Sequence, residues 1–143
     1  MKKLLTLCAA VLMAFAVTGS AMAADATVVY VEPANATYTL YTSDPIPARV
    51  LFLDATGTLA TTFGGAQIGD SVLEMKSANF GSAVIFAPTS PVNIDNSGYQ
   101  AFSIAYNEAA VTEPGDDVIT VTLKKGSTTI SNVIPIKVQA PAA

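Results

Sequence analysis

Apolar and polar residues alternate strictly along several short runs of the chain. Residues 118–123 (VITVTL) and 99–106 (YQAFSIAY) are the clearest examples. A period of two is typical of a β-strand that buries one face. The predicted apolar faces are Ile119, Val121 and Leu123 in the first run, and Phe102, Ile104 and Tyr106 in the second.

Other short runs rich in Val, Ile, Thr and aromatic residues lie between clusters of Gly, Pro, Asn and Asp. This composition favours strands separated by turns. Residues 48–53 (ARVLFL) are almost continuously apolar, which predicts a strand buried on both faces. Residues 71–76 fit either a short strand or one helical turn. The remaining predicted strands cover residues 27–31, 37–42, 58–63, 82–86 and 128–138.

Turn residues set the expected ends of these strands. Gly57 and Gly126 stand where a turn requires a positive φ, and the same is expected of Gly115 after Pro114. In the last strand we expect a β-bulge near residues 132–133, because the apolar positions there change phase. Pro135 predicts either an edge strand or a position whose nitrogen faces away from a partner strand, since proline donates no hydrogen bond to a neighbour.

Together the runs predict an all-β chain with about seven to nine strands. A single antiparallel β-sandwich would let two sheets each bury one face. We expect this domain to span residues 24–138, followed by a flexible tail at 139–143.

The first 23 residues have a different composition. Lys2 and Lys3 precede an apolar run at residues 4–17, and Ala21-Met22-Ala23 forms a small-x-small cleavage site. This order is typical of a secretory signal peptide that is cleaved after Ala23. The segment looks bacterial, so we expect a periplasmic or extracellular protein of a Gram-negative bacterium.

The composition of the remaining chain excludes several kinds of chemistry. Residues 24–143 contain neither His nor Cys, because the one cysteine is Cys8. Catalysis by a Ser-His-Asp or Cys-His pair and zinc bound by histidine are therefore excluded. Without Lys2 and Lys3 the chain has five basic and eleven acidic residues, a net charge of −6. No basic stripe is present, so we expect neither nucleic acid nor an anionic membrane as a partner.

Paired carboxylates are the remaining route to catalysis, and no pair here has a recognisable acid–base arrangement. We therefore expect no enzyme and no cofactor.

Two groups of residues are candidate binding sites. Glu113, Asp116 and Asp117 crowd the Pro114-Gly115 pair, and with Asp54 from another loop they could supply oxygen ligands for calcium. The alternative is that they only shape a turn, because Pro-Gly-Asp is an ordinary turn sequence.

Tyr41 and Tyr99 lie on faces opposite the apolar ones. They are candidate exposed rings for ligand binding, since an exposed aromatic ring can stack on a sugar. A packing role within the sheet is the alternative for both.

Several segments together resemble bacterial immunoglobulin-like domains. They are Gly98 with Phe102 and Ile104, then residues 114–116 (PGD), 118–121 (VITV) and 134–138 (IPIKV), and earlier 48–57 (ARVLFLDATG). The resemblance implies an immunoglobulin-like sandwich of a secreted or surface protein. It implies no catalytic residue and no ligand.

We therefore expect a non-catalytic interaction module, either an adhesin or an accessory protein of a surface assembly. Its partner would be another secreted or surface protein, or a second copy of itself. One alternative is a structural subunit that polymerises by exchanging the strand at residues 24–31. Another is a carbohydrate-binding domain.

Overall fold

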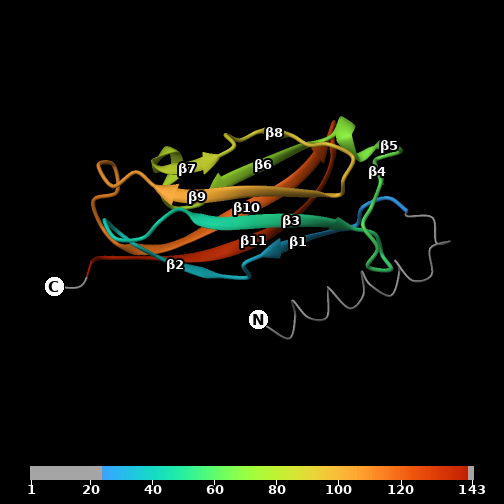
Figure 1. Cartoon of the computed structure of the whole chain (residues 1–143). Coiled ribbons are helices and arrows are strands. Elements are labelled where there is room, and N and C mark those ends of the chain that lie inside the picture. The colour runs from blue at the N-terminus through green and yellow to red at the C-terminus, as the bar shows by residue number, and fades with distance from the viewer. Residues whose placement is uncertain (1–23, 142–143) are drawn as a thin grey trace.

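The computed structural model describes residues 24–141. The predicted signal peptide, with Cys8, and the last two residues of the predicted tail lie outside this range. Within it the chain forms eleven strands and two short 3-10 helices, which confirms the all-β prediction (Figure 1). No helix in the described range is long and apolar enough to cross a membrane.

The first sheet has four antiparallel strands in the order β1-β3-β9-β7. They are β1 (Val28–Glu32), β3 (Ile46–Leu53), β9 (Tyr99–Tyr106) and β7 (Val84–Ala87). The strands β1 and β7 form its two edges. Residues 28–32 pair with β3 of the same chain. They overlap the segment at residues 24–31 that the polymerisation hypothesis would exchange between subunits.

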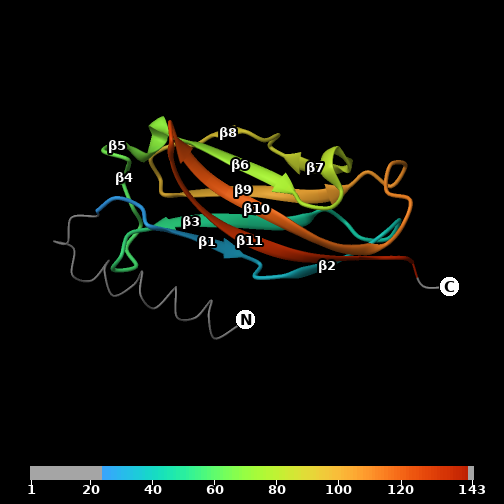
Figure 2. The same cartoon turned by 180° about the vertical axis from the view of Figure 1, so that it is seen from behind.

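The second sheet has five strands in the order β2-β11-β10-β6-β8 (Figure 2). They are β2 (Ala36–Thr39), β11 (Thr128–Gln139), β10 (Gly115–Lys125), β6 (Val72–Ser77) and β8 (Val92–Asn93). β2 runs parallel to β11, and the other neighbours are antiparallel. The ambiguous segment at residues 71–76 is therefore a strand.

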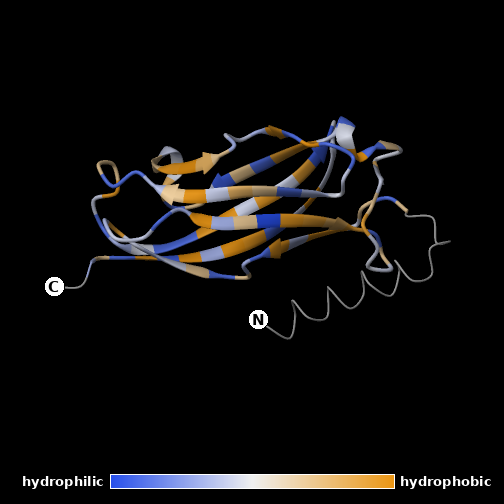
Figure 3. Ribbon diagram, in the orientation of Figure 1, coloured by the Kyte–Doolittle hydropathy of each residue, from blue (hydrophilic) through white to orange (hydrophobic). Residues whose placement is uncertain are grey.

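The two sheets pack face to face around one apolar core, which takes side chains from both. Apolar and polar segments alternate along β3, β10 and β11, as a strand with one buried face requires (Figure 3). The largest fully buried side chains include Phe52, Phe63, Ile68, Leu73, Ile104, Ile119, Leu123, Ile134 and Ile136.

The end of β3 is buried on both faces, as predicted. Val50 and Phe52 face the main core. Leu51 and Leu53 face outward, where Tyr30 and Leu59 pack against them. A nearly continuous apolar run is therefore needed here, because side chains pack against both faces of the strand.

The segment after β3 turns back but pairs with β3 only briefly. Leu53 and Leu59 form a single bridge, and the chain then makes a small hairpin of β4 (Thr62–Phe63) and β5 (Ala66–Gln67). The prediction of one strand over 58–63 was therefore wrong. Gly64 and Gly65 both have positive φ, which turns the chain before a longer strand can form. The 3-10 helices η1 (Ile68–Asp70) and η2 (Gly81–Ala83) precede β6 and β7.

The hairpin of β10 and β11 corrects two further expectations. Its register is continuous over the full length, so the predicted bulge near residues 132–133 does not form. Ile130 and Ile134 are on the same face, and the polar residue between them, Asn132, donates from Nδ2 to the Val29 carbonyl oxygen at 2.8 Å. Gly126 has φ +60° as predicted. Gly115 does not have a positive φ, because it already belongs to β10 and pairs with Val138.

Two boundary predictions also change. β2 ends at Thr39 and not at 42, since Tyr41 takes a φ of +68° in the turn that follows. β11 extends to Gln139, whose side chain donates to Thr39 Oγ1 at 2.9 Å, so the predicted tail begins one residue later. β11 lies between β2 and β10, so it is not an edge strand of the sheet. Pro135 pairs with β10 on one side, and β2 joins the other side only from Ile136 onward, so the proline faces no strand there, which fits the alternative prediction.

Candidate functional site: a groove between β6 and β7

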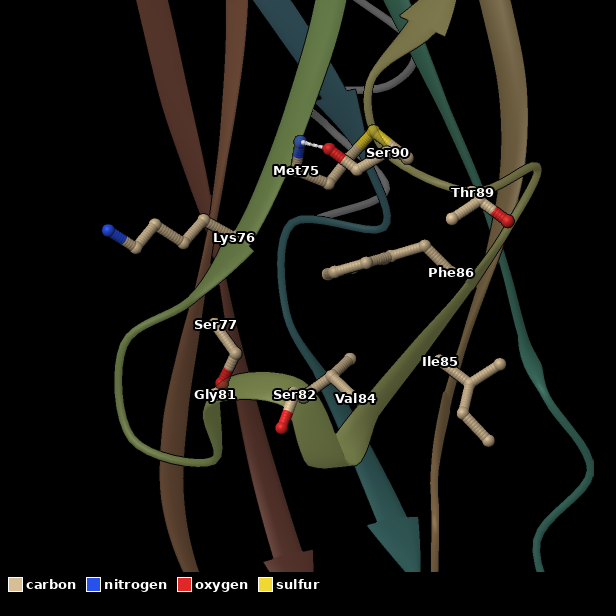
Figure 4. A pocket seen from close by; sticks show the side chains of 10 residues that line it. All are labelled: Met75, Lys76, Ser77, Gly81, Ser82, Val84, Ile85, Phe86, Thr89 and Ser90. Atoms are coloured by element: carbon tan, nitrogen blue, oxygen red, sulfur yellow. Dashed lines mark hydrogen bonds between the residues drawn. The ribbon is translucent and has the colours of Figure 1, made fainter.

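A groove of about 610 Å³ lies between β6 and β7, strands that belong to different sheets (Figure 4). Its apolar side chains are Met75, Val84, Ile85 and Phe86. Hydroxyl groups surround them, and the lining also contains Gly81 and Lys76. The hydroxyl-bearing residues are Ser77, Ser82, Thr89 and Ser90.

The groove exists because two strand edges are left uncovered side by side. β8 is only two residues long and pairs with Val72 and Leu73, so the outer edge of β6 from residue 74 onward has no neighbouring strand. β7 is the edge strand of the first sheet and pairs only with β9. Pro88 and Pro91, each after a cis peptide bond, lie in the crossing from β7 to β8.

The hydrogen-bond ladder shows which backbone groups of β7 point into this gap. The Asn107 N–H donates to the Ala83 carbonyl at 2.7 Å, in the same register as the pairing of β7 with β9. Bonded and non-bonded pairs alternate in an antiparallel ladder. Ile85 therefore bonds to β9, whereas the N–H and C=O of Phe86 point away from it. The Val84 N–H donates a hydrogen bond to the Gly81 carbonyl oxygen.

The same reasoning applies to β6. The Ala78 N–H donates to the Val118 carbonyl at 3.0 Å, so Met75 and Ser77 direct their backbone groups away from β10. The Met75 N–H is capped by Ser90 Oγ at 2.9 Å. The groove thus has outward-pointing backbone groups on both walls and apolar side chains between them.

The groove presents few charges. Of its lining residues only Lys76 is ionisable, and its side chain extends from β6 away from the other lining residues (Figure 4). Phe86 turns inward, where its ring lies 6.5 Å from that of Phe102, and Ile85 is 50 % exposed on the outer surface. A charged group entering here would lose water without gaining a counter-ion, so an uncharged ligand fits best.

Ser77 connects the groove wall to a buried polar cluster. Its hydroxyl donates to Asp117 Oδ2 at 2.7 Å, and Tyr106 Oη donates to the same oxygen at 2.8 Å. The other oxygen, Oδ1, accepts from the N–H groups of Asn79 and Val118. Burial first, and then the hydrogen bond to the Asp117 carboxylate, raise the pKa of Tyr106 far above its ordinary value. Asp117 is 1 % exposed, and all four donors come from the protein.

The structure does not bring the four predicted calcium ligands together. Asp117 points into the core, whereas Asp116 and Glu113 are exposed. Asp54 follows the end of β3, at the opposite end of the molecule from the start of β10 (Figure 1). Within residues 24–141 no three acidic residues are close enough to share a metal ion. Asp116 and Asp117 belong to a strand, and alternation sends their side chains to opposite faces.

The two predicted ligand-binding tyrosines are both exposed, 66 % for Tyr41 and 49 % for Tyr99. They lie at opposite ends of the molecule, because Tyr41 follows β2 and Tyr99 begins β9 at the other end (Figure 1). Tyr41 Oη donates to the Glu108 carbonyl at 3.3 Å. The two rings therefore cannot form one site.

Sequence reasoning missed the groove. A short predicted strand at residues 82–86 between a glycine and two prolines signals an edge strand. Nothing in the sequence shows that β6 would lie across from it.

Comparison with known proteins indicates a fold and no family. The sequence matches no family model and no curated protein. Among solved structures, the chain is similar to the E. coli chaperone DraB, with a TM-score of 0.56 and 11 % sequence identity. The match covers 82 % of this chain but only 58 % of that one, so the chain spans less than two thirds of the chaperone's length. At this identity the likeness concerns the fold alone.

Proposed function

We propose that this protein is a non-catalytic binding module that holds an extended segment of a partner polypeptide in the groove between β6 and β7. The observation that carries the proposal is the pair of uncovered strand edges, with the Phe86 N–H and C=O pointing outward on one side. A polypeptide in β-conformation satisfies such groups by adding a strand. A lipid chain has no donors or acceptors for these groups, and the hydroxyls of a sugar do not have the regular spacing of a strand's N–H and C=O groups.

The groove also limits the sequence of the segment. Met75, Val84 and Phe86 offer apolar contacts on the inner side, and most of the polar side chains around them carry hydroxyl groups. Because the side chains of an added strand alternate, every second residue of the partner would be apolar and the rest small and uncharged. The likeness to a chaperone fold supports a polypeptide ligand only as an analogy.

The wider setting is part of the same proposal. We infer an immunoglobulin-like sandwich at residues 24–139, exported by a signal peptide at 1–23 to the periplasm or the cell surface. There it would serve as an accessory or adhesive component of a surface assembly. The parallel pairing of β2 with β11 and the switch of the N-terminal segment between sheets support the immunoglobulin-like arrangement.

Peptide binding tests the proposal. A fluorescent seven-residue peptide of alternating Val and Thr, with blocked ends, should bind the protein, while a version with Glu in place of Thr should bind at least tenfold more weakly. Thr89→Trp places an indole in the groove and should abolish binding. Thr129→Trp is the matched control, since Thr129 is exposed on β11 and does not line the groove.

Fluorescence polarisation gives the affinities, and circular dichroism checks that both variants fold. The proposal is wrong if the two tryptophan variants bind the peptide equally well, or if neither peptide binds at millimolar concentration.

A further inference from the structure

The carboxylate of Asp54 is shielded, with only 4 % of the residue exposed, although it belongs to a turn. Its Oδ1 accepts from Thr56 N at 2.9 Å, Thr56 Oγ1 at 2.6 Å and Thr58 N at 3.1 Å. These bonds close the turn after β3. They leave the second oxygen, Oδ2, facing a different part of the chain.

The partner of Oδ2 is the nitrogen of Ala24, at 3.1 Å. Burial alone would raise the pKa of the Asp54 carboxyl, but the hydrogen bonds from Thr56, Ala24 and Thr58 hold it below its ordinary value. Asp54 therefore stays ionised in the fold. No Lys or Arg of the described residues forms an ion pair with it. Hydrogen bonds alone hold this shielded carboxylate, and a cation beside Oδ2 would stabilise it further, because burying an unpaired charge is costly.

Ala24 is also the residue that the predicted cleavage after Ala23 would leave first in the chain. We propose that removal of the signal peptide creates the missing cation: the new α-ammonium group of Ala24 pairs with Asp54 Oδ2 and fastens the N-terminus to the turn after β3. The inference rests on the proposed export and cleavage. An amide hydrogen bond in the precursor thus becomes a charge-assisted one in the mature chain.

Neighbouring contacts hold the amine in place. Asp25 accepts a hydrogen bond from Thr62 Oγ1, and the Ala26 N–H donates to the Thr62 carbonyl at 2.9 Å. Asp54 contacts this nitrogen, and Asp25 is the next residue along the chain. Both are acidic, so both favour the protonated amine.

The pairing predicts a particular dependence on pH. The pKa of the α-amino group is about 7.7 in an unfolded chain and should rise by about one unit in the fold. A group whose pKa is raised by folding contributes its full stability below the unfolded value and loses it as the pH passes the folded value. The added stability should therefore be present at pH 6 and lost between about pH 8 and pH 10.

Chains with defined N-termini test the pairing without depending on cellular cleavage. Residues 24–143 contain every strand and the whole apolar core that the structure describes, so this shorter chain keeps all of the described packing. Three proteins are compared: 24–143 with a free amine, 24–143 acetylated at Ala24, and the full chain. At pH 6 the free amine should have a folding equilibrium constant about tenfold larger than the acetylated form. In the Asp54→Asn background this difference should vanish.

A second measurement does not depend on the stability of the variants. The pKa of the Ala24 amine, from NMR of the folded protein, should lie about one unit above 7.7 and return toward it in Asp54→Asn. An ordinary pKa, or equal stability of the amine and acetylated forms at pH 6, overturns the proposal. N-terminal sequencing of the exported protein should begin at Ala24. Another start would also overturn it, while leaving the peptide-binding proposal to its own test.

Discussion

Replacing Asp117 should reveal how much the buried polar cluster beside the groove stabilises the fold. Its carboxylate accepts from Ser77 Oγ, Tyr106 Oη and the N–H groups of Asn79 and Val118, at 2.7–3.0 Å. Asp117→Ala removes the acceptor from all four donors. The two hydroxyls are buried and would be left without partners, whereas the Asn79 amide lies nearer to solvent and can bond to water.

The magnitude follows from the two buried hydroxyls. A hydrogen bond to a charged group contributes about 1.5–3 kcal/mol, and an orphaned buried donor costs a similar amount. Asp117→Ala should therefore lower the free energy of unfolding by ~3–5 kcal/mol, a large part of the ~5–15 kcal/mol that a domain has in total. Asp116→Ala is the matched control. Its side chain is exposed on the other face of β10, so the change should stay within ~0.5 kcal/mol.

Urea unfolding of a double-mutant cycle with Tyr106→Phe separates this cluster from simple loss of packing. In the parent chain Tyr106→Phe removes a hydrogen bond and should cost ~1–2 kcal/mol. In the Asp117→Ala background the same change removes an orphaned hydroxyl, so it should be neutral or stabilising. Equal costs of Tyr106→Phe in both backgrounds would refute the reasoning.

Three further changes have expected outcomes. Tyr41→Gly should lower the free energy of unfolding by no more than ~0.5 kcal/mol, because glycine relieves the positive φ, whereas Tyr99→Gly within a strand should cost ~1 kcal/mol; thermal melts compare the two. Asn132→Ala should cost ~1 kcal/mol in urea unfolding through its lost bond to the Val29 carbonyl, and no change would show that this bond contributes nothing. Folding depresses the pKa of Asp54, so the ionised carboxylate stabilises the fold above about pH 4, and this stabilisation is lost as the pH falls through the pKa in the folded state. The free energy of unfolding should therefore fall less steeply with acid in Asp54→Asn than in the parent. Identical acid-unfolding profiles would contradict this.

Local alternation was enough to predict β9 and the buried face of β10. Ile119, Val121 and Leu123 are all fully buried, and the turn at Gly126 has the predicted backbone conformation. Such features depend on neighbours in sequence, so a pattern of period two and a turn residue specify them. The same alternation places Asp117 on the buried side of β10. This buried position of the carboxylate does not fit the predicted role as a calcium ligand.

The features that sequence could not predict depend on which strands become neighbours. Asp54 and Asp117 were grouped by chemical type, yet the topology places them at opposite ends of the molecule. The groove depends on β8 being too short to cover β6, and no local signal sets that length. The predicted bulge does not form, because Asn132 lies on the same face as Ile130 and Ile134 and donates a hydrogen bond to the Val29 carbonyl of the other sheet.

Amide hydrogen exchange at Phe86 tests the central claim most directly, because the proposed binding uses the backbone edge of β7. The Ile85 N–H should exchange slowly, since it bonds to β9, and the Phe86 N–H should exchange rapidly in the free protein. Adding the Val/Thr peptide should slow exchange at Phe86 by at least tenfold, and no slowing should occur in Thr89→Trp. Slow exchange at Phe86 in the free protein, or an exchange rate that the peptide leaves unchanged, would contradict strand addition at this edge.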